Sequence, residues 1–190
     1  LLVTEPLNHR ISYWDDTSQF NKCMKQYTNL ILKLSDNAKQ KLIIRLHPTF
    51  RSLRGYEYQR FKKINKNLSI DPGELNIRDL IAGSRLVVYG YDSTGILETL
   101  AMNIPTMALC NNGLEHLRDS AKGFYENLLE VGIFHLSPES NAKQINKVWD
   151  DVEVWWSQDH VQHARKKFCD CFARVSNNPV LDLRKTFKEP

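Results

Sequence analysis

A strand, a turn, a helix and a second strand follow one another in RLVVYGYDSTGILETLAMNIPTMAL, residues 85–109. Residues 85–89 form an apolar run typical of a buried strand, and residues 90–94 are a small polar turn. Apolar side chains then recur at helical spacing over 95–102, until Pro105 stops the helix. Residues 106–109 are apolar again. Because strands joined by a helical crossover run parallel, this segment predicts part of a parallel α/β sheet.

The same alternation continues on both sides of this segment. Further strands are expected at 1–4, 41–46, 68–70 and 133–136. Further helices are expected at 17–34, at 56–65, at 77–82 after the cap Asn76, within 114–131, and from Ser137-Pro138 onward. Short strands without polar alternation indicate a sheet covered on both faces. We therefore predict one domain over residues 1–190, a Rossmann-like, doubly wound α/β sheet of about five to seven parallel strands.

Composition limits the range of functions. The chain has 190 residues and a formal charge of +4, with basic and acidic residues interleaved, so no nucleic-acid surface is predicted. It has no run of about 18 apolar residues and no signal-peptide pattern, which predicts no transmembrane segment and a cytoplasmic location. The four cysteines are too scattered for a zinc site, and we expect no bound metal. Because the first residue is not Met and already belongs to an apolar strand, we expect a fragment that lacks its N-terminal portion.

The first candidate site follows the strand at 41–46, since ligands of doubly wound sheets bind beyond the carboxyl ends of the strands. Arg45, His47 and Pro48 stand at this end. Pro48 keeps the backbone before it extended, and the imidazole of His47 can donate to a phosphate or a carboxylate. Arg45 is a nearby cation. The alternative is a histidine that merely completes the end of a strand.

The second candidate site is the turn after the strand at 85–89. Ser93, Thr94 and Gly95 begin the next helix. A helix start offers free N–H groups and a positive dipole end, and two hydroxyls are added here, so this turn can hold a phosphate. The GxGxxG and Walker spacings are absent, which argues against dinucleotide and NTP-hydrolase sites. The alternative is an ordinary helix cap, which contributes about 0.5–2 kcal/mol of stability.

Two acidic residues are expected to border the same crevice. Glu98 lies about one turn into the helix, where a carboxylate could accept the hydroxyls of a ribose or serve only the structure. Asp71 follows the strand at 68–70, and the backbone of its Asp71-Pro72-Gly73 turn could read a base.

The C-terminal helices, at about 138–190, carry apolar residues at helical spacing. They include Trp149, Trp155, Trp156, Leu181, Leu183 and Phe187. At this spacing such residues more often belong to a core than to a stacking platform. We therefore expect them to anchor these helices on the sheet or on a missing N-terminal domain.

A His-Pro after one strand and a Ser/Thr pair that opens a helix two strands later resemble the donor half of two-Rossmann-domain glycosyltransferases, the GT-B architecture. Within that class, both motifs are similar to those of bacterial transferases that use CMP-activated sugars, the sialyltransferases and β-Kdo transferases. Residues 91–106, together with VQHARKKF at 161–168, also resemble a family of bacterial surface-glycan transferases. The resemblance covers nearly the whole chain.

This resemblance implies that the chain is one half of a GT-B fold. His47 would contact the donor phosphate, Ser93 and Thr94 would bind it at the helix start, and Glu98 would lie near the ribose. The reaction would be a metal-independent transfer of a sugar from a nucleotide-sugar donor, with a CMP-activated sugar as the expected donor. The glycan acceptor and the catalytic base would belong to the missing N-terminal domain, so we expect the isolated chain to bind a nucleotide without turnover. The resemblance is also compatible with peripheral membrane association of the full enzyme.

Two other classes remain open at this point. A sugar-nucleotide epimerase or a glycerophosphotransferase domain shares the architecture, and the fold cannot choose among them. A non-catalytic α/β nucleotide-binding module, such as a flavodoxin-like receiver, is the other alternative. A receiver needs an acidic cluster after its first strand, which Glu5-Pro6 does not supply.

Overall fold

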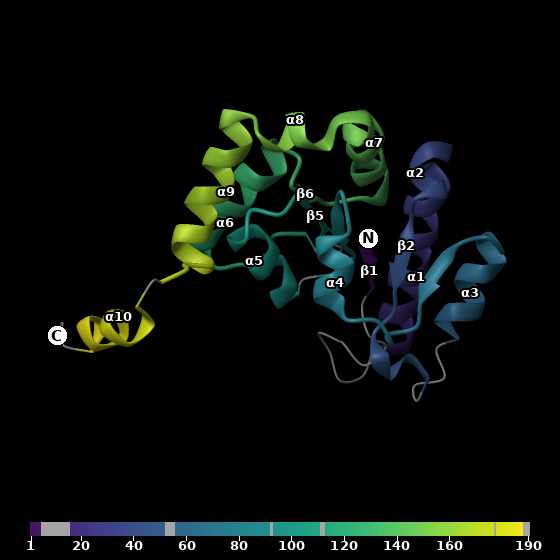
Figure 1. Cartoon of the computed structure of the whole chain (residues 1–190), viewed down its shortest axis with the longest axis horizontal. Coiled ribbons are helices and arrows are strands. Elements are labelled where there is room, and N and C mark those ends of the chain that lie inside the picture. The colour runs from purple at the N-terminus through teal and green to yellow at the C-terminus, as the bar shows by residue number, and fades with distance from the viewer. Residues whose placement is uncertain (5–15, 52–55, 92, 111–112, 177, 188–190) are drawn as a thin grey trace.

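The computed structural model of the chain describes residues 1–4, 16–51, 56–91, 93–110, 113–176 and 178–187. A six-stranded parallel sheet runs through its centre (Figure 1). The strands are β1 (Leu2–Val3), β2 (Ile43–Arg45), β3 (Ser69–Asp71), β4 (Val87–Tyr89), β5 (Thr106–Leu109) and β6 (Phe134–His135). Their order is β3-β2-β1-β4-β5-β6, and every neighbouring pair is parallel. This is the predicted Rossmann-like, doubly wound arrangement.

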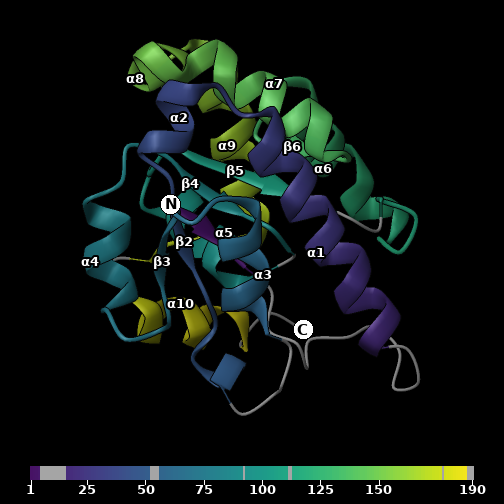
Figure 2. The ribbon, with the colours of Figure 1, turned by 90° about the vertical axis from the view of Figure 1, so that its right-hand side faces the viewer.

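Helices cover both faces of this sheet. They are α1 (Asp16–Lys33), α2 (Asp36–Gln40), α3 (Glu57–Ile64), α4 (Ile77–Ala82), α5 (Thr94–Ala101), α6 (Asp119–Glu130), α7 (Pro138–Val148), α8 (Val152–Trp156), α9 (Asp159–Phe172) and α10 (Pro179–Thr186), with short 3-10 turns at Pro48–Arg51 and Trp149–Asp151. α1 packs against α3 and α7, whereas α9 packs against α5 and α6. Figure 2 shows α1 and α4 on opposite sides of the sheet.

Several helices begin where a side chain can cap them. The side-chain oxygens of Asn76, Ser93 and Ser137 accept hydrogen bonds from backbone N–H groups in the first turns of α4, α5 and α7. These three starts are the ones that the sequence predicted. Ser35 caps α2 in the same way, a short helix that periodicity alone did not separate from its neighbours. The helix expected within 114–131 begins only at Asp119.

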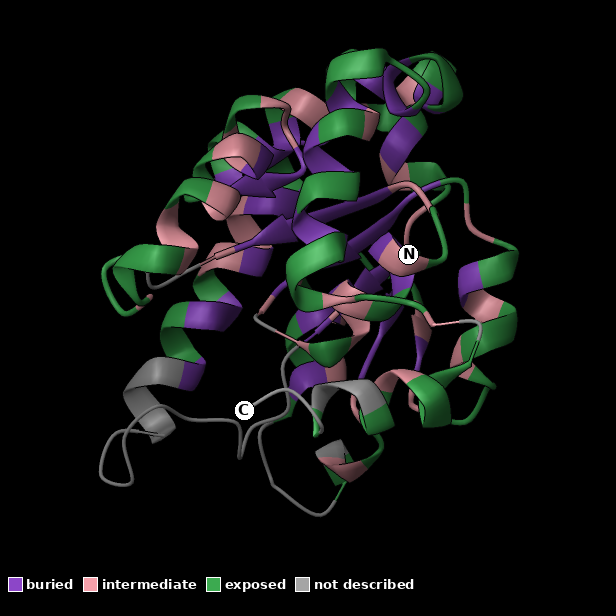
Figure 3. Ribbon diagram, turned by 90° about the vertical axis from the view of Figure 1, so that its left-hand side faces the viewer, coloured by how far each residue is buried: buried purple, intermediate pink, exposed green. Residues whose placement is uncertain are grey.

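The sheet itself forms the centre of the core. Ile44, Val87 and Met107, on three different strands, are completely buried. Figure 3 shows the strands as a buried layer inside helices whose outer sides are exposed. A strand that meets helices on both sides has no polar face, which explains why these strands lack polar alternation.

The C-terminal helices divide into two groups. Trp155 and Trp156 are buried, and their indole N–H groups donate to the carbonyls of Val131 (3.2 Å) and Asn103 (3.1 Å), as expected of core residues. α10 instead lies apart from the sheet (Figure 1). There Leu181, Leu183 and Phe187 are 49%, 57% and 84% exposed, so these three residues do not anchor α10 on this sheet, and their packing on a further domain stays a prediction. Helical spacing predicts an apolar face but does not say which surface covers it.

Gly90, directly after β4, allows a close approach between the sheet and α1. A Cβ atom at this position would lie 2.2 Å from Cε1 of Tyr27, whose hydroxyl donates to the Gly90 carbonyl at 3.1 Å. We expect Gly90→Ala to lower the free energy of unfolding by about 1–3 kcal/mol, because the buried Tyr27 ring must shift. Urea unfolding measures this effect. In the control Gly123→Ala, nothing lies within 4 Å of the new methyl group, and stability should be unchanged or higher. Equal stability of Gly90→Ala and the wild type would contradict the close approach.

Candidate functional site

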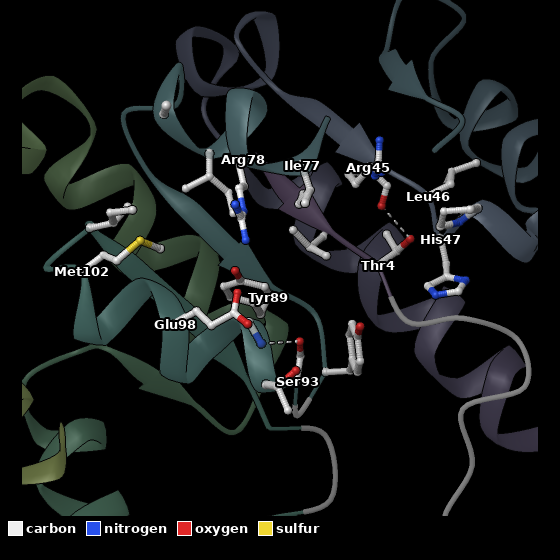
Figure 4. A pocket seen from close by; sticks show the side chains of 18 of the residues that line it. Thr4, Arg45, Leu46, His47, Ile77, Arg78, Tyr89, Ser93, Glu98 and Met102 are labelled. Carbon is white, nitrogen blue, oxygen red and sulfur yellow. Dashed lines mark hydrogen bonds between the residues drawn. The ribbon is translucent and has the colours of Figure 1, made fainter. Parts of the chain in front are cut away.

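The strand order reverses between β1 and β4. From β1 the chain continues to β2 on one side of the sheet, whereas β5 follows β4 on the other side. Such a reversal leaves a crevice at the carboxyl ends of the strands, where ligands bind in open α/β sheets. A cavity of about 860 Å³ lies here, which is within the usual size of small-molecule sites (Figure 4). Its lining comes from the ends of β1, β2 and β4, from α4, and from α5 with the turn after it.

The start of α5 forms one end of the cavity. Ser93 has extended backbone angles, and its Oγ accepts the N–H of Gly95 at 3.1 Å. The N–H of Ile96 bonds to the carbonyl of Ser93, whereas the N–H of Thr94 has no partner among the described residues. Thr94 is exposed and lines the cavity with Ser93 and Gly95. The helix start therefore offers a free N–H, two hydroxyls and a positive dipole end.

Gly95 brings the start of α5 close to the sheet. A Cβ atom on this residue would lie 2.8 Å from the Tyr89 ring and hydroxyl. Tyr89 ends β4 and is itself buried. Burial, together with the nearby Glu98 carboxylate, raises the pKa of Tyr89 to about 12, although a hydrogen bond with Thr99 acts in the other direction. The Tyr89 hydroxyl therefore stays protonated at neutral pH. The position needs glycine because any larger residue would push α5 away from this ring.

His47 lines the same cavity from the end of β2. Its Nδ1 accepts the backbone N–H of Thr49 at 3.3 Å and lies 2.8 Å from the Thr49 hydroxyl. Burial, and then the charge of Arg45, lower the pKa of His47, so the ring is neutral at pH 7. With Nδ1 as an acceptor, the proton belongs on Nε2, which has no partner among the described residues. His47 is thus a neutral hydrogen-bond donor that remains available to a ligand.

Arg45 also lines the cavity, but its charge is already neutralised. The side chain is largely buried, forms an ion pair with Asp71 and donates to the carbonyl of Leu75 at 2.8 Å. Burial acts to raise the pKa of Asp71. The hydrogen bonds from Arg45 and from the N–H groups of Leu75 and Glu74, together with the charge of Arg45, outweigh it and lower that pKa. Neither Asp71 nor the turn after it belongs to the cavity lining. The side chain of Asp71 turns inward to hold Arg45, and contact of the backbone of its turn with a base stays a prediction.

Pro48 follows His47 directly after the end of β2. It begins the 3-10 turn Pro48–Arg51 and lines the cavity next to His47. The backbone of Gly73 packs on it so closely that a Cβ atom there would lie 2.8 Å from the Pro48 Cα. Gly73 also has a φ of +88°, which residues other than glycine rarely adopt. The Asp71-Pro72-Gly73 turn therefore supports the His47-Pro48 segment from behind.

The structure brings together most of the residues predicted for the site and adds others. Arg45, His47, Pro48, Ser93, Thr94, Gly95 and Glu98 all line the cavity. Thr4, Arg78, Tyr89 and Tyr91 line it too, although the sequence did not single them out. Thr4 directly follows β1 and Tyr89 ends β4. Both could have been predicted, because ligands bind at the ends of the central strands. No sequence signal marks Arg78, because an exposed arginine on a short helix is ordinary. Among the described residues, no cluster of His, Cys, Asp or Glu is arranged to hold a metal ion.

Comparison with known families assigns the chain to a group of transferases. The model of the LIC12162 family transferase matches residues 1–187, nearly the whole sequence. The chain belongs to this family. No curated protein and no solved structure matches it. In the described part of this LIC12162 family transferase, no helix is long and apolar enough to cross a membrane.

Proposed function

We propose that this LIC12162 family transferase binds a nucleotide-activated sugar and forms the donor half of a glycosyltransferase that acts on a surface glycan. The observation that carries the proposal is the meeting of His47 and the α5 start in one cavity at the reversal of the strand order. Both offer hydrogen-bond donors that carry no formal charge, since the pKa of His47 is lowered. A phosphate is the ligand group that such a pair of donors suits best.

The chemistry follows from the charge that develops during transfer. When the bond between the sugar and the phosphate breaks, negative charge grows on the leaving phosphate. The His47 Nε2–H and the N–H of Thr94 stabilise that charge because the fold holds them in position before the reaction. The Ser93 and Thr94 hydroxyls add donors at the same place. The proposed reaction uses these groups and no metal ion. Its partners are the nucleotide-sugar donor and the glycan acceptor.

The remainder of the cavity supports a nucleoside next to the phosphate. Between α4 and α5 its walls are largely apolar, with Ile77, Ile81, Ala101 and Met102 among the lining residues. A flat, partly apolar base fits such walls better than a sugar does. We expect a cytidine nucleotide, in line with the resemblance to transferases of CMP-activated sugars, and a cytoplasmic location.

Nucleotide binding tests the proposal directly. A thermal-shift panel of CMP, CDP, UDP, GDP and dTDP identifies the base, because a ligand that binds only the folded state raises the melting temperature. We expect a cytidine nucleotide to bind with micromolar to millimolar affinity, roughly −8 to −4 kcal/mol. If none of the five nucleotides binds at millimolar concentration, the proposal is wrong.

The double substitution Ser93→Ala, Thr94→Val is expected to weaken this binding about tenfold or more, because it removes two hydroxyls from the phosphate end. Calorimetry on both proteins measures the change. Loss of the Ser93 cap should also lower stability by about 0.5–2 kcal/mol. Ser137→Ala removes an equivalent cap from α7, outside the cavity, and should lower stability without weakening binding. Equal affinity of the wild type and the double variant for the nucleotide would contradict phosphate binding at the α5 start.

A further inference from the structure

The segment VQHARKKF at 161–168 lies within α9 and contributes no residue to the cavity. α9 nevertheless packs against α5, the helix whose start forms the phosphate end of that cavity. Arg165, in the middle of the segment, is buried although it carries a charge. In the part of the chain that the structure describes, no carboxylate forms an ion pair with it. Because an unpaired buried charge is costly, Arg165 needs a partner of another kind.

Arg165 has this partner at the carboxyl end of α5. Its Nη1 donates to the carbonyl of Leu100 at 2.8 Å, and its Nε donates to Oε1 of Gln162 at 3.0 Å. Leu100 is in the last turn of α5, where carbonyl groups lack partners within the helix and the helix dipole is negative. The charge of Arg165 is therefore compensated by the end of α5.

A second set of hydrogen bonds holds the turn directly after α5. The Nε2 of Gln162 donates to the carbonyl of Trp156 at 2.7 Å. The indole N–H of Trp156 lies 3.1 Å from the carbonyl and 3.0 Å from the Oδ1 of Asn103, a residue with a φ of +58° that few residues other than glycine adopt. We call Arg165, Gln162 and Trp156 the α5 clamp. The clamp holds both the last turn of α5 and the turn that follows it.

The segment held by the clamp is also a wall of the cavity. Ala101, Met102 and Ile104 belong to the lining. Leu100 and Asn103, the two residues that the clamp contacts, alternate with them along the chain and do not belong to it. A shift of the backbone at Leu100 or Asn103 therefore moves the wall. In Figure 4, Met102 lies at the opposite end of the cavity from His47, on the side where the proposed function places the base.

We propose that Arg165 and Trp156 are positioning residues, which hold the apolar wall at 101–104 in place and thereby set the affinity for the nucleoside part of the donor. Neither side chain lines the cavity, so each acts through the end of α5 and the turn after it. This inference rests on the proposed function, because it requires a nucleoside against that wall. It gives the segment 161–168 a role in donor binding.

The two neighbouring tryptophans of α8 provide a matched test. Trp155→Phe and Trp156→Phe each remove an indole N–H from a buried ring, but Trp155 donates to Val131, which is outside the cavity. By calorimetry, Trp156→Phe should bind CMP about fivefold or more weakly than the wild type, whereas Trp155→Phe should bind CMP like the wild type. Thermal melts should show a loss of stability in both variants, because each leaves a carbonyl without its donor.

A ligand without a base separates a displaced wall from a general loss of packing. Ribose 5-phosphate keeps the phosphate and the ribose of CMP, so ligand-observed NMR at millimolar concentration should show equal binding to the wild type and Trp156→Phe. Arg165→Met should likewise weaken CMP more than ribose 5-phosphate. Arg165→Lys retains a charged donor for the carbonyl of Leu100 and should keep part of the CMP affinity that Arg165→Met loses.

The outcomes separate this inference from the function on which it rests. If the wild type binds no nucleotide, the proposed function itself fails. If the wild type and Trp156→Phe bind CMP equally well, the nucleotide site stands and the positioning role is wrong. Equal weakening of CMP in Trp155→Phe and Trp156→Phe would indicate a general loss of packing and overturn the proposal. So would a loss of the same factor for CMP and ribose 5-phosphate in Trp156→Phe.

Discussion

In the intact enzyme, with the acceptor-binding half present, His47→Ala is expected to lower the rate of sugar transfer by about a hundredfold or more. The substitution removes a preorganised, neutral donor from the leaving phosphate, and the loss of one such donor in other enzymes costs about 2.7–4 kcal/mol of transition-state stabilisation. Since the charge develops mainly in the transition state, the turnover number should fall more than the affinity for the donor. Steady-state kinetics of the intact enzyme, with the nucleotide sugar that this chain binds, measures both.

Two further variants make this result specific. His47→Gln places an amide N–H near the position of Nε2 and should retain part of the activity that His47→Ala loses. His163→Ala removes an exposed histidine from α9, outside the cavity, and should leave the rate unchanged. Comparable rates for His47→Ala and the wild type would exclude His47 from the reaction.

Asp71→Ala is expected to lower the free energy of unfolding by about 3–5 kcal/mol, because it leaves the largely buried Arg45 guanidinium without its counter-charge. Urea unfolding measures this loss. The exposed pair of Arg51 and Glu74 offers a matched control from the same region. Glu74→Ala should cost less than about 1 kcal/mol, since an exposed ion pair in water contributes little. Similar losses in both variants would contradict a special role for the buried pair.

The same ion pair predicts a pH dependence of stability. Because the pKa of Asp71 in the folded chain lies below its ordinary value of 3.8, the folded state favours the ionised carboxylate. The stabilisation is therefore complete above about pH 4 and is lost as the pH falls through the lowered pKa. Asp71→Asn cannot ionise, so its stability difference from the wild type should shrink over this acidic range. A difference that does not change with pH would contradict the lowered pKa.

Local features of the sequence determined the fold class and two of the segments that line the cavity, the His47-Pro48 segment and the start of α5. The apolar runs predicted at 41–46, 85–89 and 106–109 contain the strands at 43–45, 87–89 and 106–109, because runs without polar alternation suit a sheet that is buried on both faces. Ser93 predicts the start of α5 because its own side chain caps the first turn. His47 was predictable because it follows a strand, and strand ends form the ligand edge of a parallel sheet.

Tertiary structure alone decided how charge is distributed in the site. Arg45 and Asp71 are 26 residues apart in sequence, and they pair because β2 and β3 are neighbours in the sheet. The charge of Arg45, which was a candidate to bind a phosphate because Arg45 is close to His47 in the sequence, is thereby neutralised by Asp71. Arg78 enters the same cavity because α4 and α5 flank the point where the strand order reverses. Sequence periodicity describes which face of an element is apolar, but the identity of the neighbour across that face depends on strand order, which arises from contacts between distant segments.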